Sequence, residues 1–294
     1  MFEQIKTNVK LLLIIYKKNI SIALAIFAFI TYFYNADELV SFLNNIFKNS
    51  NYFFIKTALF IGIVVIGLIV LFFISLLMVI FKKSEVIIKN KLICEYNDIF
   101  KIKPKNNSIF VIPVNTAFDV IVDDDLTKAS ALVSSKTLHG QFIKDISKNI
   151  SVVELDEMIK KSLSDFGYKP IKEISVKRGN SKLYPIGTIA TIQNKNVYYY
   201  LLAISQFDKS NVAHSTKEDI ITAIIALIKK YNENGQCNDL YIPLFGTGLS
   251  RSNISNKYIA LQIIISIFKA YESEITGKVH IIIFDKEKSQ IPLK

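Results

Sequence analysis

The chain has 294 residues, enough for two domains, and its 36 Lys and Arg residues against 25 Asp and Glu give a formal net charge of +11. Only Arg178 and Arg251 are arginine, and a lysine-rich excess suits anionic lipid headgroups or a phosphorylated ligand better than the reading of nucleic-acid bases. We therefore expect no nucleic-acid partner. The two cysteines and three histidines follow no metal-ligand or disulfide spacing, so we also expect no metal and no cofactor.

Residues 1–84 are predicted to be a membrane region with two transmembrane helices. The run Asn19–Ala36 has 18 residues without a charge and would reach about 27 Å as a helix, and the run Thr57–Phe81 has 25 and would reach about 37 Å. The longer run spans a hydrocarbon core of about 30 Å, and the shorter one just does. A cleaved signal peptide is the rival interpretation of the first run, although no clear small-x-small cleavage site follows Tyr34.

Lysines determine the predicted orientation of these two helices. They precede the first run and follow the second, so the positive-inside rule places both ends of the region, and all that follows it, in the cytoplasm. Neither run contains an acid or a base, which argues against a transporter built from one copy. Two such helices suit an anchor, or a unit that acts by assembling into a homo-oligomer.

Residues 85–294 alternate strand-like and helix-like segments and are predicted to form one cytoplasmic ligand-binding domain. Ser151-x-x-Glu154 is a capping-box pattern, and Thr216 followed by two acids is a second helix start. The alternation predicts a mostly parallel sheet with helices on both faces, which binds ligands beyond the carboxyl ends of its strands. The expected strands are 85–96, 109–115, 186–192, 197–205, 240–243 and 279–284, and the expected helices are 152–166, 217–232 and 256–271.

The loop after the strand 240–243 is the most informative one. It contains Gly246 and Gly248, which allow the backbone to approach a ligand closely, so that successive N–H groups can converge on phosphate oxygens. Thr247, Ser250 and Arg251 add possible donors. The pattern matches neither a Walker loop nor a dinucleotide fingerprint, and a Gly-x-Gly alone most often marks a tight turn.

Two polar residues follow other strands. Asn115 can donate to and accept from a ribose hydroxyl, although an isolated asparagine more often caps a turn. Asp98 can accept from an exocyclic adenine amine, but it can equally be a solvated acid in a loop.

Taken in order, these segments resemble the signature elements of macro domains, which bind ADP-ribose. The resemblance rests on Asp98-Ile99, on Val114-Asn115-Thr116-Ala117 and on Ile242–Gly248, and it covers about residues 85–285. With two preceding membrane helices, the chain is similar to the transmembrane-macro effectors of Thoeris antiphage defence systems. The resemblance implies a three-layer α/β/α domain with a mixed, mostly parallel sheet. It also implies that a TIR-domain partner converts NAD into an ADP-ribose-type, histidine-linked signal that the macro domain senses.

The resemblance also assigns the site residues. It implies that Asp98 contacts adenine, that Asn115 lies on the distal ribose side, and that the 246–251 loop surrounds the pyrophosphate through Gly246, Thr247, Gly248, Leu249, Ser250 and Arg251. A second phosphate loop corresponds to 134–142 and contributes Thr137 and Gly140, but it has one glycine rather than three. Two interpretations of Lys136 and His139 stay open. They either contact a phosphate or a group on the terminal ribose, or they are a solvated loop lysine and a packed histidine.

Departures from the family bear on catalysis. Macro domains that hydrolyse ADP-ribosyl bonds usually carry a second asparagine two or three residues after the first, where this chain has Ala117 and Phe118. We therefore expect a sensor without catalytic residues. It would act in the bacterial inner membrane, where the signal triggers oligomerisation and membrane disruption that lead to cell death or growth arrest. The alternatives are a membrane-anchored macro-domain ADP-ribosyl hydrolase and a passive anchor.

Overall fold

A computed structural model describes residues 52–81, 84–88, 91–105, 107–125, 133–174, 179–207, 213–246 and 256–288, together with the single positions 16, 20, 254, 290, 291 and 293. The chain forms two compact units, one of residues 1–82 with residue 294 and one of residues 83–293. Each unit is described by itself below.

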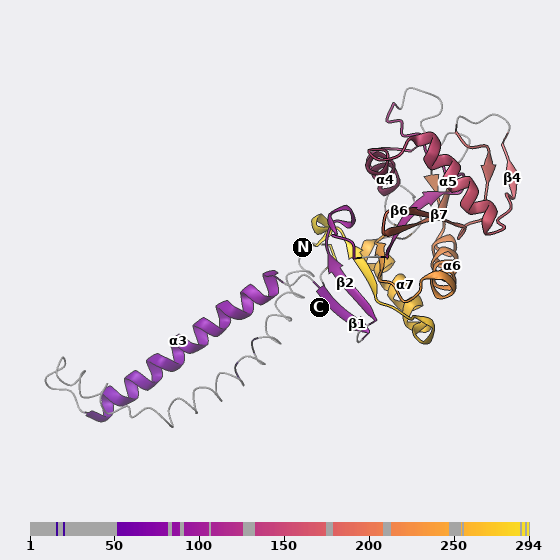
Figure 1. The fold of residues 1–294 in the computed structure, drawn as a ribbon. Helices are drawn as coiled ribbons and strands as arrows, with labels where there is room; N and C mark the ends of the chain where they lie inside the picture. The colour runs from indigo at the N-terminus through magenta and orange to yellow at the C-terminus, as the bar shows by residue number, and fades with distance from the viewer. Residues whose placement is uncertain are drawn as a thin grey trace. The chain divides into compact units, whose positions relative to one another are not determined.

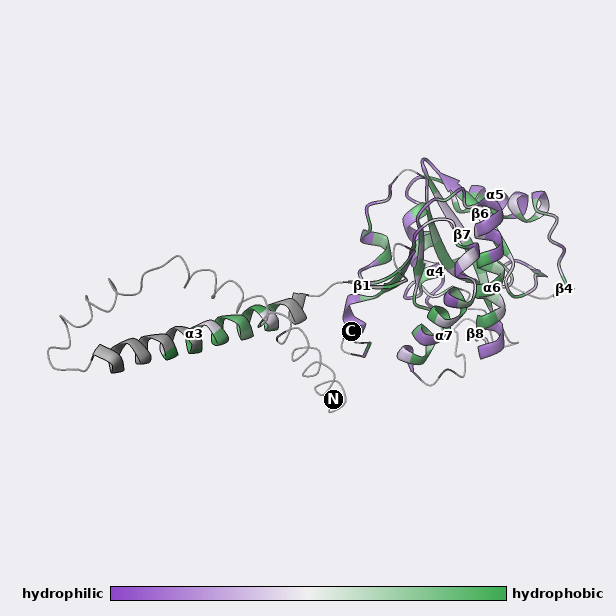
Figure 2. Cartoon of the chain, turned by 90° about the horizontal axis from the view of Figure 1, so that it is seen from below, coloured by the Kyte–Doolittle hydropathy of each residue, from purple (hydrophilic) through white to green (hydrophobic). Residues whose placement is uncertain are grey.

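The first unit contains the helix α3, Tyr52–Phe81, whose 30 residues give a length of about 45 Å (Figure 1). Its described side chains are apolar along most of the helix, as the colouring of Figure 2 shows. The Tyr16 hydroxyl donates to the Leu68 carbonyl at 3.3 Å, and its ring meets that of Phe72 edge-on. Counting only residues that the structure describes, no helix is both long enough and apolar enough to cross a membrane. The predicted first span, 19–36, lies outside the described residues except for Ile20.

The second unit is built on a mixed sheet with the strand order β1-β2-β10-β9-β3-β7-β6, and β8 pairs with β7 (Figure 1). The pairs β2–β10, β10–β9, β9–β3 and β3–β7 are parallel, whereas β1, β6 and β8 join in antiparallel fashion. The mixed, mostly parallel sheet is therefore confirmed. The strands are β1 Ser84–Ile88, β2 Leu92–Tyr96, β3 Ser108–Asn115, β6 Ile189–Asn194, β7 Val197–Phe207, β8 Ala213–His214, β9 Leu240–Pro243 and β10 Val279–Ile283.

Helices cover both faces of this sheet because alternate side chains of a strand point to opposite faces. Ile112 and Val114 of β3 pack with α4, Leu138–Ile146, and α5, Val152–Asp165. Ile109 and Val111 pack on the other face with α6, Lys217–Asn234, and α7, Lys257–Ala270. The result is a three-layer α/β/α unit. Short 3-10 helices lie at 99–101 (η1), 272–274 (η2) and 285–287 (η3), and a small separate sheet pairs β4, Lys172–Glu173, with β5, Lys182–Leu183.

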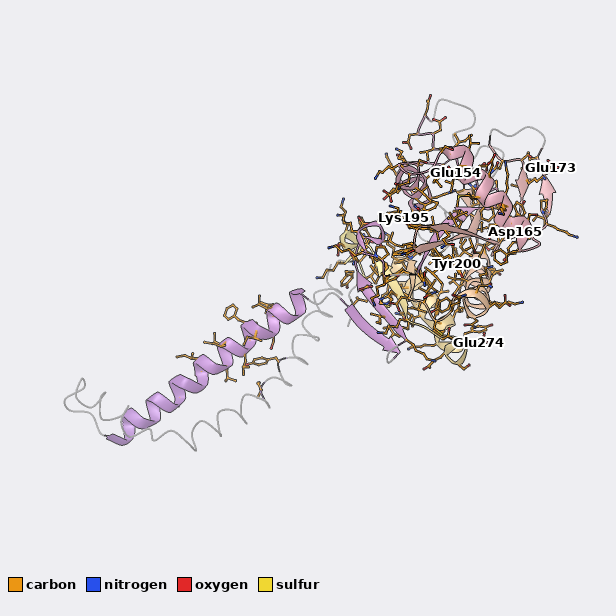
Figure 3. The ribbon with its side chains drawn as sticks, in the orientation of Figure 1. Glu154, Asp165, Glu173, Lys195, Tyr200 and Glu274 are labelled. Atoms are coloured by element: carbon orange, nitrogen blue, oxygen red, sulfur yellow. The ribbon has the colours of Figure 1, made fainter. Side chains whose placement is uncertain are left out.

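Local signals account for the helix starts. Ser151 Oγ accepts from the Glu154 amide at 3.1 Å, and Figure 3 labels Glu154 in the first turn and Asp165 at the end of α5. The reciprocal capping box forms at Thr216 and Asp219, where each side chain bonds the other residue's amide.

Sequence prediction missed two features of this unit. The single strand expected over 85–96 is the hairpin β1–β2, because the polar Lys89-Asn90-Lys91 interrupts the apolar run. The segment expected as a phosphate loop at 134–142 continues into the helix α4, whose nine residues are too few to show a clear helical period.

Candidate ligand-binding rim

The carboxyl ends of four neighbouring strands bring the predicted site residues together. Extending the Tyr96–Ile283 pair by two residues aligns 98 with 285, and extending Ile282–Pro243 by three aligns 285 with 246. Extending Ile109–Leu240 by six aligns 246 with 115. Counted on from these pairs, Asp98, Asp285, Gly246 and Asn115 fall at one level, at or just after the ends of their strands. Three strand spacings separate the first from the last, about 14 Å. We call this level, with Phe284 beside it, the rim.

Hydrogen bonds beyond the strand ends support this register. The Asn97 amide donates to the Ile283 carbonyl at 2.9 Å, and the Leu244 amide donates to the Ile282 carbonyl at the same distance. The pairing of β2, β10 and β9 thus continues for one residue beyond the end of β2 and of β9.

Asp98 begins the 3-10 helix η1 and is partly engaged. Its Oδ1 accepts from the Phe100 amide at 3.1 Å, and its Oδ2 lies 3.9 Å from Lys101 Nζ. The side chain is about one quarter exposed, with a relative exposure of 24%. Because a carboxylate has about four acceptor positions, Asp98 can still accept from a ligand amine.

Asn115 ends β3 and is buried. Its Oδ1 accepts from the amides of Ala117 at 2.9 Å and Asp119 at 3.3 Å, which is the turn-capping role expected of an isolated asparagine. Its Nδ2 has no hydrogen-bond partner among the described residues, and the same is true of Thr116 Oγ1. An unpaired buried donor costs about 1–3 kcal/mol, so a ligand that accepts from Nδ2 would relieve a penalty already present.

Phe118 points into the core instead of toward a solvent-facing site. It is 1% exposed, and its ring meets that of Tyr184 edge-on at 5.8 Å. Its backbone φ is +52°, a left-handed conformation that a bulky side chain rarely adopts. A polar group that acts on a substrate is therefore missing from this position.

Gly246 requires its glycine. Its φ is +99°, and an added Cβ would lie 3.3 Å from Cδ1 of Ile254. The other predicted contacts of this loop, Thr247, Gly248, Leu249, Ser250 and Arg251, lie outside the described residues. Their roles stay predictions.

Thr137 and Gly140 build the start of α4. Thr137 Oγ1 accepts from the Gly140 amide at 3.0 Å and donates to the Ser134 carbonyl at 2.7 Å. A Cβ on Gly140 would lie 2.2 Å from the Ser134 carbonyl oxygen, so only glycine allows this approach. Lys136 is exposed, whereas burial lowers the pKa of His139 to about 3 and keeps its ring neutral. The packed-histidine interpretation fits this position.

Sequence reasoning did not single out Phe284 and Asp285. Phe284 follows β10 directly and is 41% exposed at the rim between the levels of β2 and β9. An exposed aromatic residue at the end of a buried strand was the available signal. Within the described ranges, no group of three or more His, Cys, Asp or Glu is placed to hold a metal ion.

The family model described as the macro domain of the Thoeris protein ThsA matches residues 93–284. The chain belongs to this family. The Thoeris protein ThsA of Bacillus amyloliquefaciens (strain Y2) is 30% identical over 200 residues, which make up 67% of this chain and 60% of that protein. The chain thus matches less than two thirds of the length of that relative. The resemblance to Thoeris macro-domain effectors, drawn from Asp98, Asn115 and Gly246, is confirmed.

The chain is also similar to solved macrodomains. A macrodomain of Oceanobacillus iheyensis solved with ADPR is 13% identical, with a TM-score of 0.38, and the match covers 70% of this chain and 92% of that one. A Trypanosoma brucei macrodomain in complex with ADP-ribose is 9% identical, with a TM-score of 0.38 and coverage of 68% and 66%.

The range matched by the ThsA macro-domain family begins within β2 and ends one residue after β10. It contains Asp98, Asn115, Gly246 and Phe284, whereas α3 lies before it. The family assignment therefore applies to the second unit.

Proposed function

We propose that this chain is a membrane effector of antiphage defence whose macro domain senses an ADP-ribose derivative, histidine-linked and made from NAD by a TIR-domain partner. Binding of the signal favours assembly of several copies, which disrupts the bacterial inner membrane and causes cell death or growth arrest. One observation carries the proposal: Asp98, Gly246 and Asn115 lie at or just after the carboxyl ends of β2, β9 and β3, within a run of four neighbouring strands.

The chemistry along the rim fits an extended nucleotide. Asp98 offers a carboxylate to an adenine amine, and Phe284 offers an exposed ring on which a base can stack. The Gly246 backbone permits N–H groups to face a pyrophosphate, and Asn115 Nδ2 is a buried donor for a ribose oxygen. The order of these groups across the strands is the order of adenine, pyrophosphate and distal ribose.

A sensor is favoured over a hydrolase by the turn after β3. Asn115 Oδ1 is occupied by two amides, Ala117 has no polar side chain, and the Phe118 ring is buried against Tyr184. The one acceptor left among the side chains of residues 115–118 is the buried Thr116 hydroxyl, which is neutral and too weak a base to activate a water molecule. The turn can hold a ribose but has no group to activate a nucleophile.

The membrane part of the proposal is supported by the sequence of α3, in which residues 57–81 carry no charge. Ile61, Ile66 and Phe73 are more than half exposed, with 55, 64 and 57%. A helix with apolar side chains exposed along its length is typical of contact with lipid or with copies of itself. The macro domain would then lie in the cytoplasm.

The test uses the full chain in detergent micelles for binding and in liposomes for leakage. We expect ADP-ribose and its histidine-linked form to raise the thermal midpoint of unfolding. A ligand concentration of one hundred times Kd corresponds to about 2.7 kcal/mol of stabilisation. In liposomes, we expect the histidine-linked form to release a trapped dye. Gly246→Glu should abolish both effects because the side chain is strained and repels phosphate. Gln193→Glu adds the same charge on the exposed surface of β6 and should retain both. Wild-type protein that neither binds nor leaks would contradict the proposal.

A further inference from the structure

We infer that Asn180 is a positioning residue that holds the Asn115 turn in its ligand-ready form and so sets affinity for the distal ribose. The inference rests on the proposed function. Asn180 does not belong to the rim, and it lies 65 positions after Asn115 in the chain (180 minus 115). It reaches the turn through two hydrogen bonds and joins it to α5 through a third.

The turn at 115–119 needs support from outside. The Phe118 amide donates to the Asn115 carbonyl at 3.0 Å, and Phe118 holds a φ of +52° that its ring makes unfavourable. Such conformations persist where the surrounding structure holds them in place. Any relaxation of Phe118 moves the amides of residues 117 and 119, and these are the groups that fix Asn115 Oδ1.

Asn180 supplies that support at the strained residue, Phe118, and at the next one, Asp119. Its backbone amide donates to Asp119 Oδ1 at 2.8 Å, and its side-chain Nδ2 donates to the Phe118 carbonyl at 3.0 Å. The same Nδ2 donates to Asp156 Oδ1 of α5 at 3.0 Å. One amide group therefore uses both of its hydrogens to tie the strained turn to a helix.

Tyr184 provides a second attachment that does not depend on the Asn180 side chain. Its amide donates to the Thr116 carbonyl at 2.9 Å, and its ring packs edge-on against Phe118. Removing the Asn180 side chain thus leaves the fold of the segment in place while it releases the Phe118 carbonyl. The expected result is a turn that is present but less well positioned.

The geometry predicts a selective loss of affinity. Asn115 lies at one end of the rim and Asp98 at the other, with the level of Gly246 between them. ADP contains the adenosine and the pyrophosphate but no distal ribose. A loosened Asn115 turn therefore weakens ADP-ribose and leaves ADP unchanged.

The experiment measures ADP-ribose and ADP affinities by calorimetry for full-length wild type, Asn180→Ala and Asn180→Asp in micelles. We expect ADP-ribose to bind about tenfold more weakly to Asn180→Ala, the equivalent of one hydrogen bond, and more weakly still to Asn180→Asp, whose carboxylate faces Asp156. The affinity for ADP and the denaturation midpoint without ligand should stay close to wild type. Asn232→Ala is the matched control, because its Nδ2 bonds Glu274 at 3.0 Å at the far end of α6.

Each outcome is decisive. If Asn180→Ala binds ADP-ribose as tightly as wild type, or loses ADP-ribose and ADP affinity to the same degree, the positioning role is wrong while the proposed function stands. If wild type binds no ADP-ribose, the proposed function fails and this inference fails with it. If ADP does not bind wild type, the loss of ADP-ribose affinity in Asn180→Ala is compared with the change in its denaturation midpoint. Weaker ADP-ribose binding at an unchanged midpoint supports the positioning role. Weaker binding in proportion to a lower midpoint contradicts it.

Discussion

Replacing Gly140 by alanine should unfold the start of α4 at a predictable cost. An added Cβ would lie 2.2 Å from the Ser134 carbonyl oxygen, where ordinary contact begins at 3.4 Å, so the carbonyl must retreat by about 1.2 Å (3.4 minus 2.2). That carbonyl accepts from the Thr137 amide at 3.1 Å and from Thr137 Oγ1 at 2.7 Å. The displacement therefore breaks two hydrogen bonds of the turn that begins the helix.

The magnitude follows from three opposing contributions. Two lost hydrogen bonds are worth about 1–3 kcal/mol, and overpacking adds about 1–3 kcal/mol. Alanine gains about 1 kcal/mol over glycine in helix propensity. Because both losses come from one displacement they are not fully additive, so we expect a net loss of about 2–3 kcal/mol. For a unit of this size that lowers the midpoint by about 4–12 °C.

Urea denaturation of the full chain in micelles, followed by tyrosine near-UV circular dichroism, measures this loss. Thr137→Ala should cost about 1 kcal/mol as a cap deletion, and Thr137→Ser should cost little. Gly62→Ala is the control, since an added Cβ there meets nothing within 4 Å. A Gly140→Ala protein as stable as wild type would refute the close packing of the Ser134 turn on α4.

Three further predictions concern the rim and its surroundings. Gly246→Ala forces a side chain to a φ of +99°, about 1–2 kcal/mol of strain, and should weaken ADP-ribose binding in calorimetry; unchanged affinity would contradict the role of this backbone. Phe284→Ala should leave stability nearly unchanged, because the ring is 41% exposed, yet weaken ADP-ribose about tenfold, whereas Phe284→Trp should restore it. The folded pKa of His139 is about 3 and the unfolded pKa about 6.5, so only the unfolded chain binds this proton between those values. Stability then falls as pH drops from 6.5 toward 3, by up to a few kcal/mol, and His139→Leu should flatten this part of the pH–stability curve.

Sequence patterns predicted the parts of the fold that local chemistry dictates. The helices α5, α6 and α7 were expected from their helical patterns. Two of them, α5 and α6, also had a predicted capping residue, and Ser151 and Thr216 do accept from the expected amides. The parallel strands were expected from their Ile- and Val-rich runs. Helix α4 was not, because its cap, Thr137, lies in a stretch whose single glycine suggested a loop.

The site shows a different limit of sequence reasoning. Asp98, Asn115 and Gly246 were predicted as site residues because each follows a strand and matches a family motif. Phe284 was not predicted, since its proposed role depends on which strands are neighbours, and a strand order is not visible in a linear sequence. Thr137 and Gly140 were expected as ligand contacts, but only the structure reveals that they form the cap of α4.

The free energy that a switch requires indicates how the rim must work in the proposed sensor. To move assembly from about 1% to 99%, a ligand must bind the assembled state about 10⁴-fold more tightly than the other, whereas one hydrogen bond is worth about tenfold. Several contacts must therefore differ between the two states. Asp98 and Asn115 lie at opposite ends of the rim, on β2 and β3, with β10 and β9 between them. A ligand that pairs with both residues responds to small changes in the twist of these four strands. In the sequence, β2 follows β1 after three residues, and β1 follows α3 after two. In the proposed sensor, the strand expected to receive the adenine end is thus the one closest in sequence to the helix proposed to lie in the membrane.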